Sequence, residues 1–229
     1  MRAVDKFQMS QGSSGWATGV AGPQVDGKFF RVDGERFYIR GVTYGTFAEI
    51  KLGLFSRLKR VEEDFAAREA VGINTVRTYT VPGLEILDLA EEVGLRLFVG
   101  VWWEDPRYLD PTDRGSWHEM ESGARTAVQQ AVESCADHPT VLGFVLGNEI
   151  PGTVVRWHGR RRIEDLLRGL CETGKDVAPQ ALFSYANYPR TQYLDTSCFD
   201  CFNVFLLLGL LHFLPSSARH GVGSARGGA

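Results

Sequence analysis

The chain has 229 residues, of which 44% are hydrophobic and 23% are charged, and its net charge is -3. This balance is typical of one globular domain with a core, and the small negative charge gives no general attraction to nucleic acid or to an anionic membrane. We therefore expect neither as a partner. No secretory signal pattern is visible at the start, and four cysteines in a chain this long do not suggest a disulfide framework. A cytoplasmic location is expected.

Residues 1–28 are rich in glycine, serine and glutamine and show no sustained hydrophobic period, which predicts a flexible leader. Two β-prone runs then flank Asp33-Gly34, the strongest short-range hairpin signal in the chain. The second run continues into an apolar strand that ends near Tyr44.

Helical and strand patterns alternate along the rest of the chain. Helices are predicted where apolar residues recur at helical spacing, over residues 61–72, 84–94, 119–137 and 160–177. Strands are predicted where the runs are β-branched or continuously apolar, over residues 73–79, 95–103, 140–149, 181–189 and 198–206. Together with the strand that ends near Tyr44, these runs give about six strands of one sheet.

This alternation predicts an α/β fold, either an eight-fold (β/α)8 barrel of TIM type or an open doubly wound sheet. The barrel is favoured because no glycine-rich phosphate turn follows the first strand, and because a barrel gathers the residues that end its strands on one face. With about six strands, the barrel expected over residues 29–206 is incomplete. Residues 207–229 change abruptly in composition and are expected to be a disordered or frame-shifted tail. The strand-ending residues are Tyr44, Arg77, Trp103 with Glu104, Asn148 with Glu149, Asn187 and Asn203.

Two short motifs suggest other chemistry. CFDC, from Cys198 to Cys201, has the spacing of half a metal or redox site, but in a strand its two cysteines face opposite sides and no second pair follows. GRRR, at residues 159–162, opens a helical pattern and is typical of a solvated first turn. We therefore expect no metal and no cofactor.

Glu149 ends a strand that is predicted to be buried, where a carboxylate is costly unless it is paired or kept protonated. It is thus either a structural group held by an arginine or a catalytic acid. Breaking an acetal needs a proton for the leaving oxygen, a second carboxylate for the oxocarbenium-like centre, and hydrogen bonds to neighbouring hydroxyls. Asn148 and Glu149 supply two of these three, which favours the catalytic interpretation and a carbohydrate as the substrate.

Three motifs in this order, RGVTYG, NTVRTYTVP and GNEIP, resemble the catalytic barrel of the family 2 glycoside hydrolases, the β-galactosidase and β-glucuronidase type of the retaining clan. VGVWWEDPRYLD and GNEIPGTVVRWHGRRRIEDLL are most similar to bacterial members that are sometimes linked to glycosyltransferases. The resemblance covers roughly residues 29–206. It implies an enzyme that hydrolyses O-glycosyl bonds of a β-linked carbohydrate.

The resemblance also implies roles for single residues. Glu149 would be the general acid/base, and Asn148 would hydrogen-bond the sugar hydroxyl beside the reacting carbon. Arg77 would lie near the nucleophile, or would form a structural ion pair. Of two adjacent tryptophans, Trp103 rather than Trp102 would offer a stacking face to a sugar ring.

Tyr44 and Asn187 would complete the rim of the site, or would be satisfied buried polar groups. The chain departs from the family at Thr80, where a histidine usually stands, and it shows no strand seven with the nucleophilic glutamate. Glu104 and Asp105 could replace the nucleophile only at the wider carboxylate spacing of inversion. The chain is therefore expected to be truncated before that strand and inactive or weak. The alternative is a non-catalytic carbohydrate-binding remnant, and the sequence indicates no oligomeric state.

Overall fold

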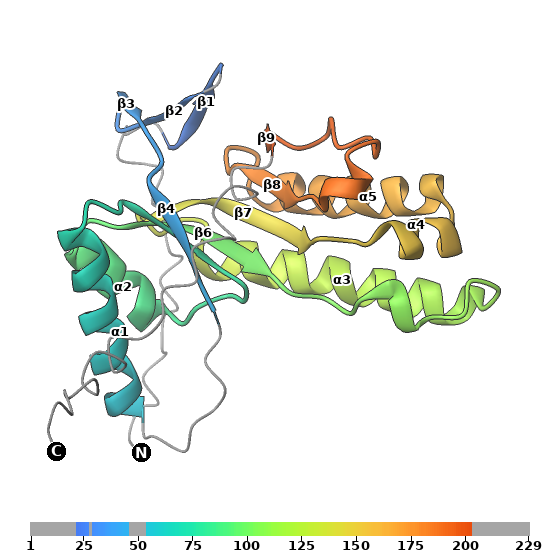
Figure 1. Cartoon of the computed structure of the whole chain (residues 1–229), viewed down its shortest axis with the longest axis horizontal. Coiled ribbons are helices and arrows are strands. Elements are labelled where there is room, and N and C mark those ends of the chain that lie inside the picture. The colour runs from blue at the N-terminus through green and yellow to red at the C-terminus, as the bar shows by residue number, and fades with distance from the viewer. Residues whose placement is uncertain (1–21, 28, 46–53, 203–229) are drawn as a thin grey trace, which may run out of the picture.

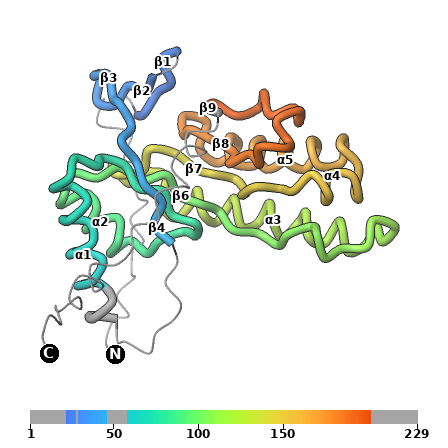
Figure 2. The backbone as a smooth tube through the Cα atoms, viewed as in Figure 1, coloured from blue at the N-terminus to red at the C-terminus, as the bar shows by residue number. Residues whose placement is uncertain are grey.

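The structure is a computed structural model that describes residues 22–27, 29–45 and 54–202. It contains a three-stranded antiparallel sheet, β1-β2-β3, and a six-stranded parallel sheet, β4-β5-β6-β7-β8-β9 (Figure 1; Figure 2). The strands are β1 Gln24–Asp26, β2 Phe29–Val32, β3 Glu35–Phe37, β4 Gly41–Tyr44, β5 Thr75–Thr78, β6 Arg96–Val101, β7 Val141–Asn148, β8 Phe183–Ala186 and β9 Cys201–Phe202. The helices are α1 Leu54–Ala70, α2 Leu84–Glu92, α3 Arg114–Cys135, α4 Gly152–His158 and α5 Arg160–Val177, with short 3-10 helices η2 Pro106–Tyr108 and η3 Pro189–Thr191.

The strands of the large sheet lie side by side in chain order, and every neighbouring pair is parallel. Figure 1 shows α1 and α2 beside one half of this sheet and α3, α4 and α5 beside the other half. The chain therefore has the predicted α/β fold, with the strand and helix order of a partial TIM-type barrel. The strands that the structure describes do not close into a ring.

Apolar residues pack on both faces of the large sheet. Along β6, Leu97, Val99 and Val101 belong to the main core with the helices, whereas Phe98 points to the opposite face and packs with residues of β2. The rings of Phe30 and Phe98 meet edge to face, with centroids 6.0 Å apart. The small sheet therefore packs against the face opposite the helices.

Asp33 and Gly34 form the predicted hairpin turn, with backbone φ angles of 53° and 80°. Positive φ at both central residues is the type I′ geometry, which matches the twist of the two strands. β1 was not predicted, because it lies within residues 1–28, which were expected to be a flexible leader. It pairs with β2, so the expected boundary at residue 28 is too late. Most of that leader lies outside the described residues.

The helices differ from the predictions at three places. α1 begins at Leu54 rather than at residue 61. α3 begins at Arg114 rather than near residue 119, because the Asp113 side chain accepts hydrogen bonds from the N–H groups of Gly115 and Ser116. Such an N-cap starts a helix whose polar first turn carries no hydrophobic period. α4 was missed altogether, since it spans less than two turns after Pro151. α5 has the predicted bounds.

The segment 198–206 was expected to be one strand, but its described part contributes only Cys201 and Phe202 to β9. Cys198 lies in the preceding turn, so the two cysteines of CFDC do not sit on one strand as expected. Asn203 and the expected tail at residues 207–229 lie outside the described residues.

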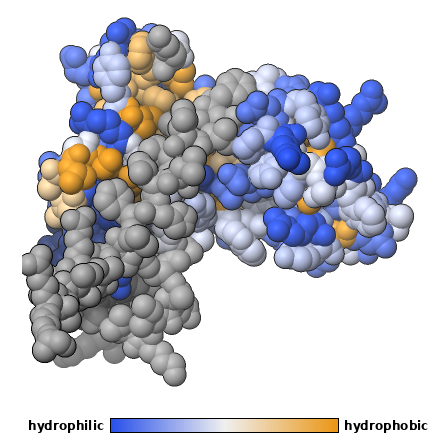
Figure 3. Space-filling view, viewed as in Figure 1, coloured by the Kyte–Doolittle hydropathy of each residue, from blue (hydrophilic) through white to orange (hydrophobic). Residues whose placement is uncertain are grey.

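The surface over α3, α4 and α5 is mainly hydrophilic, whereas hydrophobic residues gather on the opposite side of the view, at the upper left (Figure 3). None of the helices that the structure describes is both long enough and apolar enough to span a membrane.

Candidate functional site

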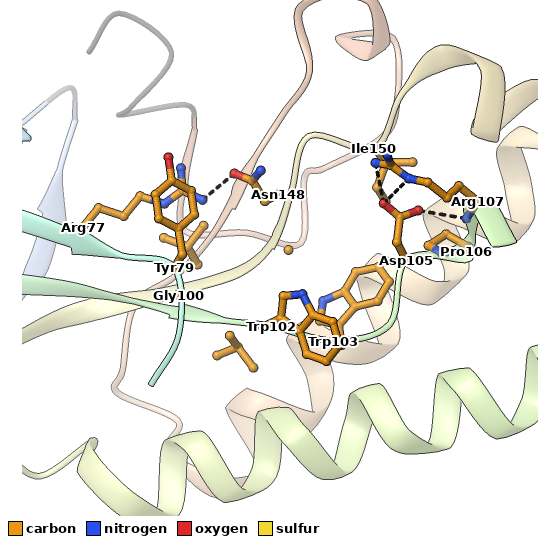
Figure 4. Close-up of a pocket in the computed structure, with 13 residues that line it drawn as sticks. Arg77, Tyr79, Gly100, Trp102, Trp103, Asp105, Pro106, Arg107, Asn148 and Ile150 are labelled. Atoms are coloured by element: carbon orange, nitrogen blue, oxygen red, sulfur yellow. Dashed lines mark hydrogen bonds and ion pairs between the residues drawn. The ribbon is translucent and has the colours of Figure 1, made fainter. Parts of the chain in front are cut away.

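A pocket of about 210 Å³ lies at the carboxyl ends of β5, β6 and β7 (Figure 4). In a parallel sheet of this type, this end carries the chemistry. Aromatic and charged side chains share its lining: Arg77, Tyr79, Trp102, Trp103, Asp105, Arg107 and Asn148.

Arg77 joins two strands that are not neighbours. Its Nη2 donates to Oδ1 of Asn148 over 2.7 Å, from the end of β5 to the end of β7, and β6 lies between them (Figure 4). On β6, Gly100 permits the close approach of the backbone that follows β5, because an added Cβ would lie 2.3 Å from the backbone oxygen of Thr78. Burial lowers the pKa of the Arg77 guanidinium, while Tyr79 and Glu149 raise it. The guanidinium is nevertheless cationic at neutral pH, so it fixes the amide of Asn148 by a charge-assisted bond.

Glu149 has an unusual backbone. Its φ is 50°, in the left-handed region that few residues other than glycine adopt, and its side chain is exposed rather than buried as expected. Two hydrogen bonds from β8 hold this turn: the Glu149 N–H donates to the Ala186 carbonyl over 2.7 Å, and the Ile150 N–H donates to the Tyr185 hydroxyl over 3.0 Å. A strained residue that its surroundings hold in place is a frequent property of functional sites.

The carbonyl of Ile150 is also held. Thr191 donates to it from Oγ1 over 3.2 Å, and the same hydroxyl lies 2.8 Å from Oδ1 of Asn187. Asn187 was expected at the rim, but it is buried and lies outside the pocket lining, bonded to Thr191. It therefore supports the turn that carries Glu149. Tyr185 and Thr191 were missed, because a tyrosine in a strand and a threonine in a loop carry no sequence signal of such a contact.

The two tryptophans play different parts. Trp103 is 9% exposed and packs in the main core, whereas Trp102 is 71% exposed, and both border the pocket. The ring of Trp103 lies against Gly147, whose φ is 107° and where an added Cβ would lie 3.1 Å from the ring. Among the described residues, Nε1 of Trp103 has no hydrogen-bond partner. The stacking face was expected on Trp103, but the exposed ring is that of Trp102, while Trp103 brings a buried donor to the pocket.

Asp105 and Arg107 form an ion pair at the pocket wall. Nη2 of Arg107 lies 2.6 Å from Oδ2 of Asp105, whose other oxygen accepts from the Arg107 N–H at the start of η2 (Figure 4). The hydrogen bond with Asp105 raises the pKa of Arg107. Glu104 is exposed and lies outside the lining, so the carboxylate that faces the pocket from this strand end is Asp105.

Three side chains from the corner between α4 and α5 hold the loop between β6 and α3. His158 Nε2 lies 2.6 Å from the Pro106 carbonyl, Trp157 Nε1 donates to Leu109 over 3.4 Å, and Arg162 donates to Pro111 over 3.0 Å. Because a carbonyl only accepts, His158 carries its proton on Nε2. This corner, which follows Glu149 in the chain, thereby fixes the loop that carries Asp105 and Arg107.

Tyr44, which was expected at the rim of the site, is not among the residues that line this pocket; it borders a second pocket that also includes Tyr79. Its hydroxyl donates to Oδ2 of Asp64 on α1 over 3.0 Å, and the Arg68 guanidinium lies 4.7 Å from its ring centre. Burial, together with the charge of Asp64, raises the pKa of Tyr44. Side chains two residues apart in a strand share a face. Tyr44 therefore lies on the same side of β4 as Val42, toward the helices.

One group with metal-ligand chemistry lies near the amino end of β7, away from the pocket: Asp88, Glu91 and His138. Nε2 of His138 is 3.2 Å from Asp88, and its Nδ1 accepts from the N–H of Thr140 over 3.3 Å. With Nδ1 accepting, the ring donates from Nε2 to the Asp88 carboxylate. In this structure the Nε2 atom is therefore engaged in a hydrogen bond between α2 and the segment before β7.

No protein-family model matches the chain. Part of the sequence is similar to the 1,3-beta-glucanosyltransferase GAS5 of Saccharomyces cerevisiae, with 31% identity over 130 residues. The match covers 53% of this chain and 25% of the yeast protein, so the chain spans about a quarter of the length of this relative.

Solved β-glucuronidases share the fold. The enzyme of Ruminococcus gnavus matches with a TM-score of 0.61 and 12% identity, over 79% of this chain and 32% of that chain. The enzyme of Parabacteroides merdae matches with a TM-score of 0.56 and 16% identity, over 71% and 20%. Beta-glucuronidase 3 of Bacteroides uniformis matches with a TM-score of 0.54 and 20% identity, over 69% and 20%. The chain therefore has a glycoside hydrolase-like fold.

Proposed function

We propose that the chain is a glycoside hydrolase-like domain of the family 2 type, acting on a β-linked carbohydrate with Glu149 as general acid/base. The observation that carries the proposal is the position of Glu149. It follows Asn148, which Arg77 fixes at the mouth of an aromatic pocket, at the functional end of a glycosidase-like sheet.

Glu149 is not itself a lining residue but lies between two that are, Asn148 and Ile150. Glu149 and the polar and aromatic groups of the pocket each have a role in acetal cleavage. The Glu149 carboxyl donates its proton to the leaving oxygen, a contribution of roughly 10² to 10⁴ in rate. Because Oδ1 of Asn148 accepts from Arg77, the amide NH2 of Asn148 is the group that donates to a sugar hydroxyl. Trp102 offers its exposed ring for stacking, and Nε1 of Trp103 is a further donor.

A retaining mechanism needs a second carboxylate as the nucleophile. Among the described residues that line the pocket, the candidate is Asp105, and both of its oxygens are already used by Arg107. Asp105 is therefore a poor nucleophile. The second candidate function follows from this observation: a carbohydrate-binding domain that uses the same pocket without catalysis.

The pocket is suited to a neutral sugar rather than a uronic acid. Both arginines that line it already have partners, Arg77 with Asn148 and Arg107 with Asp105. A uronate carboxylate would compete with Asn148 and Asp105 for these two guanidinium groups. A neutral β-linked glucan is thus the proposed substrate, in line with the name of the yeast relative.

The test compares hydrolysis of an aryl β-glucoside and an aryl β-glucuronide by the wild-type chain and the Glu149→Gln variant. We expect turnover of the glucoside alone, and its loss by at least about 10²-fold in the variant. Glu92→Gln on the exposed end of α2 is the matched control and should retain the wild-type rate.

Calorimetric titration with a β-linked gluco-oligosaccharide separates the two functions. Equal binding by the wild type and Glu149→Gln, with no turnover by either, would establish the binding domain and exclude the enzyme. Preference for the glucuronide would overturn the proposed substrate class.

A further inference from the structure

Two cysteines that are distant in sequence lie in contact beside α5. The thiol of Cys171, in the middle of α5, donates to the backbone carbonyl of Cys198, 27 residues later, over 3.0 Å. Cys171 is buried and Cys198 is half-buried, so solvent reaches the pair from the Cys198 side. In this structure, all four cysteines of the chain carry free thiols.

The two thiols differ in acidity. The neighbouring Cys171 side chain lowers the pKa of Cys198, to which the charge of Arg168 also contributes. The neighbouring Cys198 side chain, together with burial, raises the pKa of Cys171. Cys198 is therefore the thiol that loses its proton first, and a half-buried thiolate beside a second thiol has the properties of a redox-reactive site.

The other two cysteines lack these properties. Cys135 is buried in α3, where its thiol donates to the Ala131 carbonyl over 3.2 Å, and burial raises its pKa to about 11. Burial also raises the pKa of Cys201 to about 11. Cys201 belongs to the cluster on the face that packs against β2, whereas Cys171 and Cys198 belong to the helix side of the sheet. The sheet thus separates Cys201 from the pair, although CFDC places it close to Cys198 in sequence.

We propose that Cys171 and Cys198 are an oxidation site that closes to a disulfide between α5 and the turn before β9. With hydrogen peroxide as the oxidant, the Cys198 thiolate attacks one oxygen, the O–O bond breaks, and a sulfenic acid and water form. The Cys171 sulfur then attacks the Cys198 sulfur, the S–O bond breaks, and a second water leaves with the Cys171 proton. Two thiols lose two electrons and two protons, and one peroxide is reduced to two waters.

The bond would enclose the segment that supports the candidate site. Between Cys171 and Cys198 lie β8, which carries Tyr185, and η3, which ends at Thr191, with Asn187 between the two elements. These three residues support the turn at Glu149. Closing this segment restricts the unfolded chain and stabilises the folded one. The proposal does not depend on the function of the pocket, because the pair lies outside its lining.

The experiment treats the reduced full-length chain with stoichiometric hydrogen peroxide and maps its peptides without reduction by mass spectrometry. We expect a Cys171 peptide joined to a Cys198 peptide, with two hydrogens lost, and two of the four thiols no longer titratable. The thermal midpoint should rise by several degrees and return when dithiothreitol is added.

Cys198→Ser should abolish the link and the thermal shift, and Cys135→Ser should change neither. The reduced variants should unfold at the wild-type midpoint, which checks that they fold. A link between Cys198 and Cys201, a link between two chains, or oxidation of Cys198 to sulfinic acid without any link would overturn the proposal. Because the peptide map of the wild type decides the matter, a variant that fails to fold does not leave it undecided.

Discussion

Nη2 of Arg77 and Oδ1 of Asn148 meet at 2.7 Å, although the two residues are 71 positions apart and stand on strands that are not neighbours. The bond links β5 to β7 across β6, and it orients the amide that precedes Glu149. Part of the pocket lining is therefore a hydrogen-bonded pair of polar side chains, beside the two tryptophans that follow β6.

A double-mutant cycle on this bridge should show strong coupling. Arg77→Met and Asn148→Ala should each weaken binding of a β-linked gluco-oligosaccharide, and the double variant should lose less than the sum. Because the bond is charge-assisted and Asn148 is solvent-exposed, we expect a coupling of about 1.5 kcal/mol, measured by calorimetry. Additive losses would mean that Arg77 acts through another group.

Tyr185→Phe tests the support of the turn at Glu149. The variant keeps the ring but removes the oxygen that accepts from the Ile150 N–H, which leaves a buried donor unpaired. We expect a loss of about 1–3 kcal/mol in the free energy of unfolding, measured by urea denaturation, and a fall in kcat that exceeds any rise in KM. Tyr193→Phe, with an exposed side chain, is the matched control and should change neither.

Strand order, the hairpin and α5 were predictable because each follows from a local signal. Apolar runs alternate with helical periods, and Asp33-Gly34 carries the turn geometry in its own residue types. α3 and β1 were misjudged because a side-chain cap at Asp113 and pairing with β2 decide them, and neither leaves a hydrophobic period.

The candidate site was predictable only in part. Their positions at the ends of strands predicted Arg77 and Asn148 as site residues, and the structure brings the two into contact. Tyr44 and Asn187 were predicted in the same way, but they are hydrogen-bonded to Asp64 and Thr191. A sequence pattern gives the face of a strand residue only while the alternation is regular. At Glu149 the backbone turns to a positive φ, so the exposure of its side chain could not be deduced from the strand that precedes it.

Backbone strain at Glu149 should make glycine more stabilising than alanine at this position, whereas glycine is usually the less stable of the two. Both Glu149→Gly and Glu149→Ala remove the carboxylate, but glycine adopts a φ of 50° without the Cβ penalty. We expect Glu149→Gly to be more stable than Glu149→Ala by about 1 kcal/mol in chemical denaturation. At Glu63, exposed within α1, the order should be opposite, with glycine the less stable by about 1 kcal/mol. The same order at both positions would contradict the strained turn.

His158→Asn should make the loop between β6 and α3 more mobile, although His158 itself does not line the pocket. The shorter amide cannot reach the Pro106 carbonyl, so the loop that carries Asp105 and Arg107 loses one of its three side-chain anchors. We expect weaker oligosaccharide binding, by roughly 10-fold, and faster hydrogen exchange over residues 105–111. His118→Asn on the exposed face of α3 is the control. Unchanged exchange in the loop would show that the other two anchors suffice.

Acid should weaken the start of α3 through Asp113. Hydrogen bonds from the Ser116 side chain and backbone, and from the Gly115 N–H, hold the pKa of Asp113 below its ordinary value of 3.8. A depressed folded-state pKa gives stability that is present above the ordinary value and is lost as the pH falls through the folded value. The stability difference between the wild type and Asp113→Asn, which still caps the helix but does not titrate, should therefore shrink between about pH 5 and pH 2. Urea unfolding across that range measures it, and a difference that stays constant with pH would show that the Asp113 charge has no part in the cap.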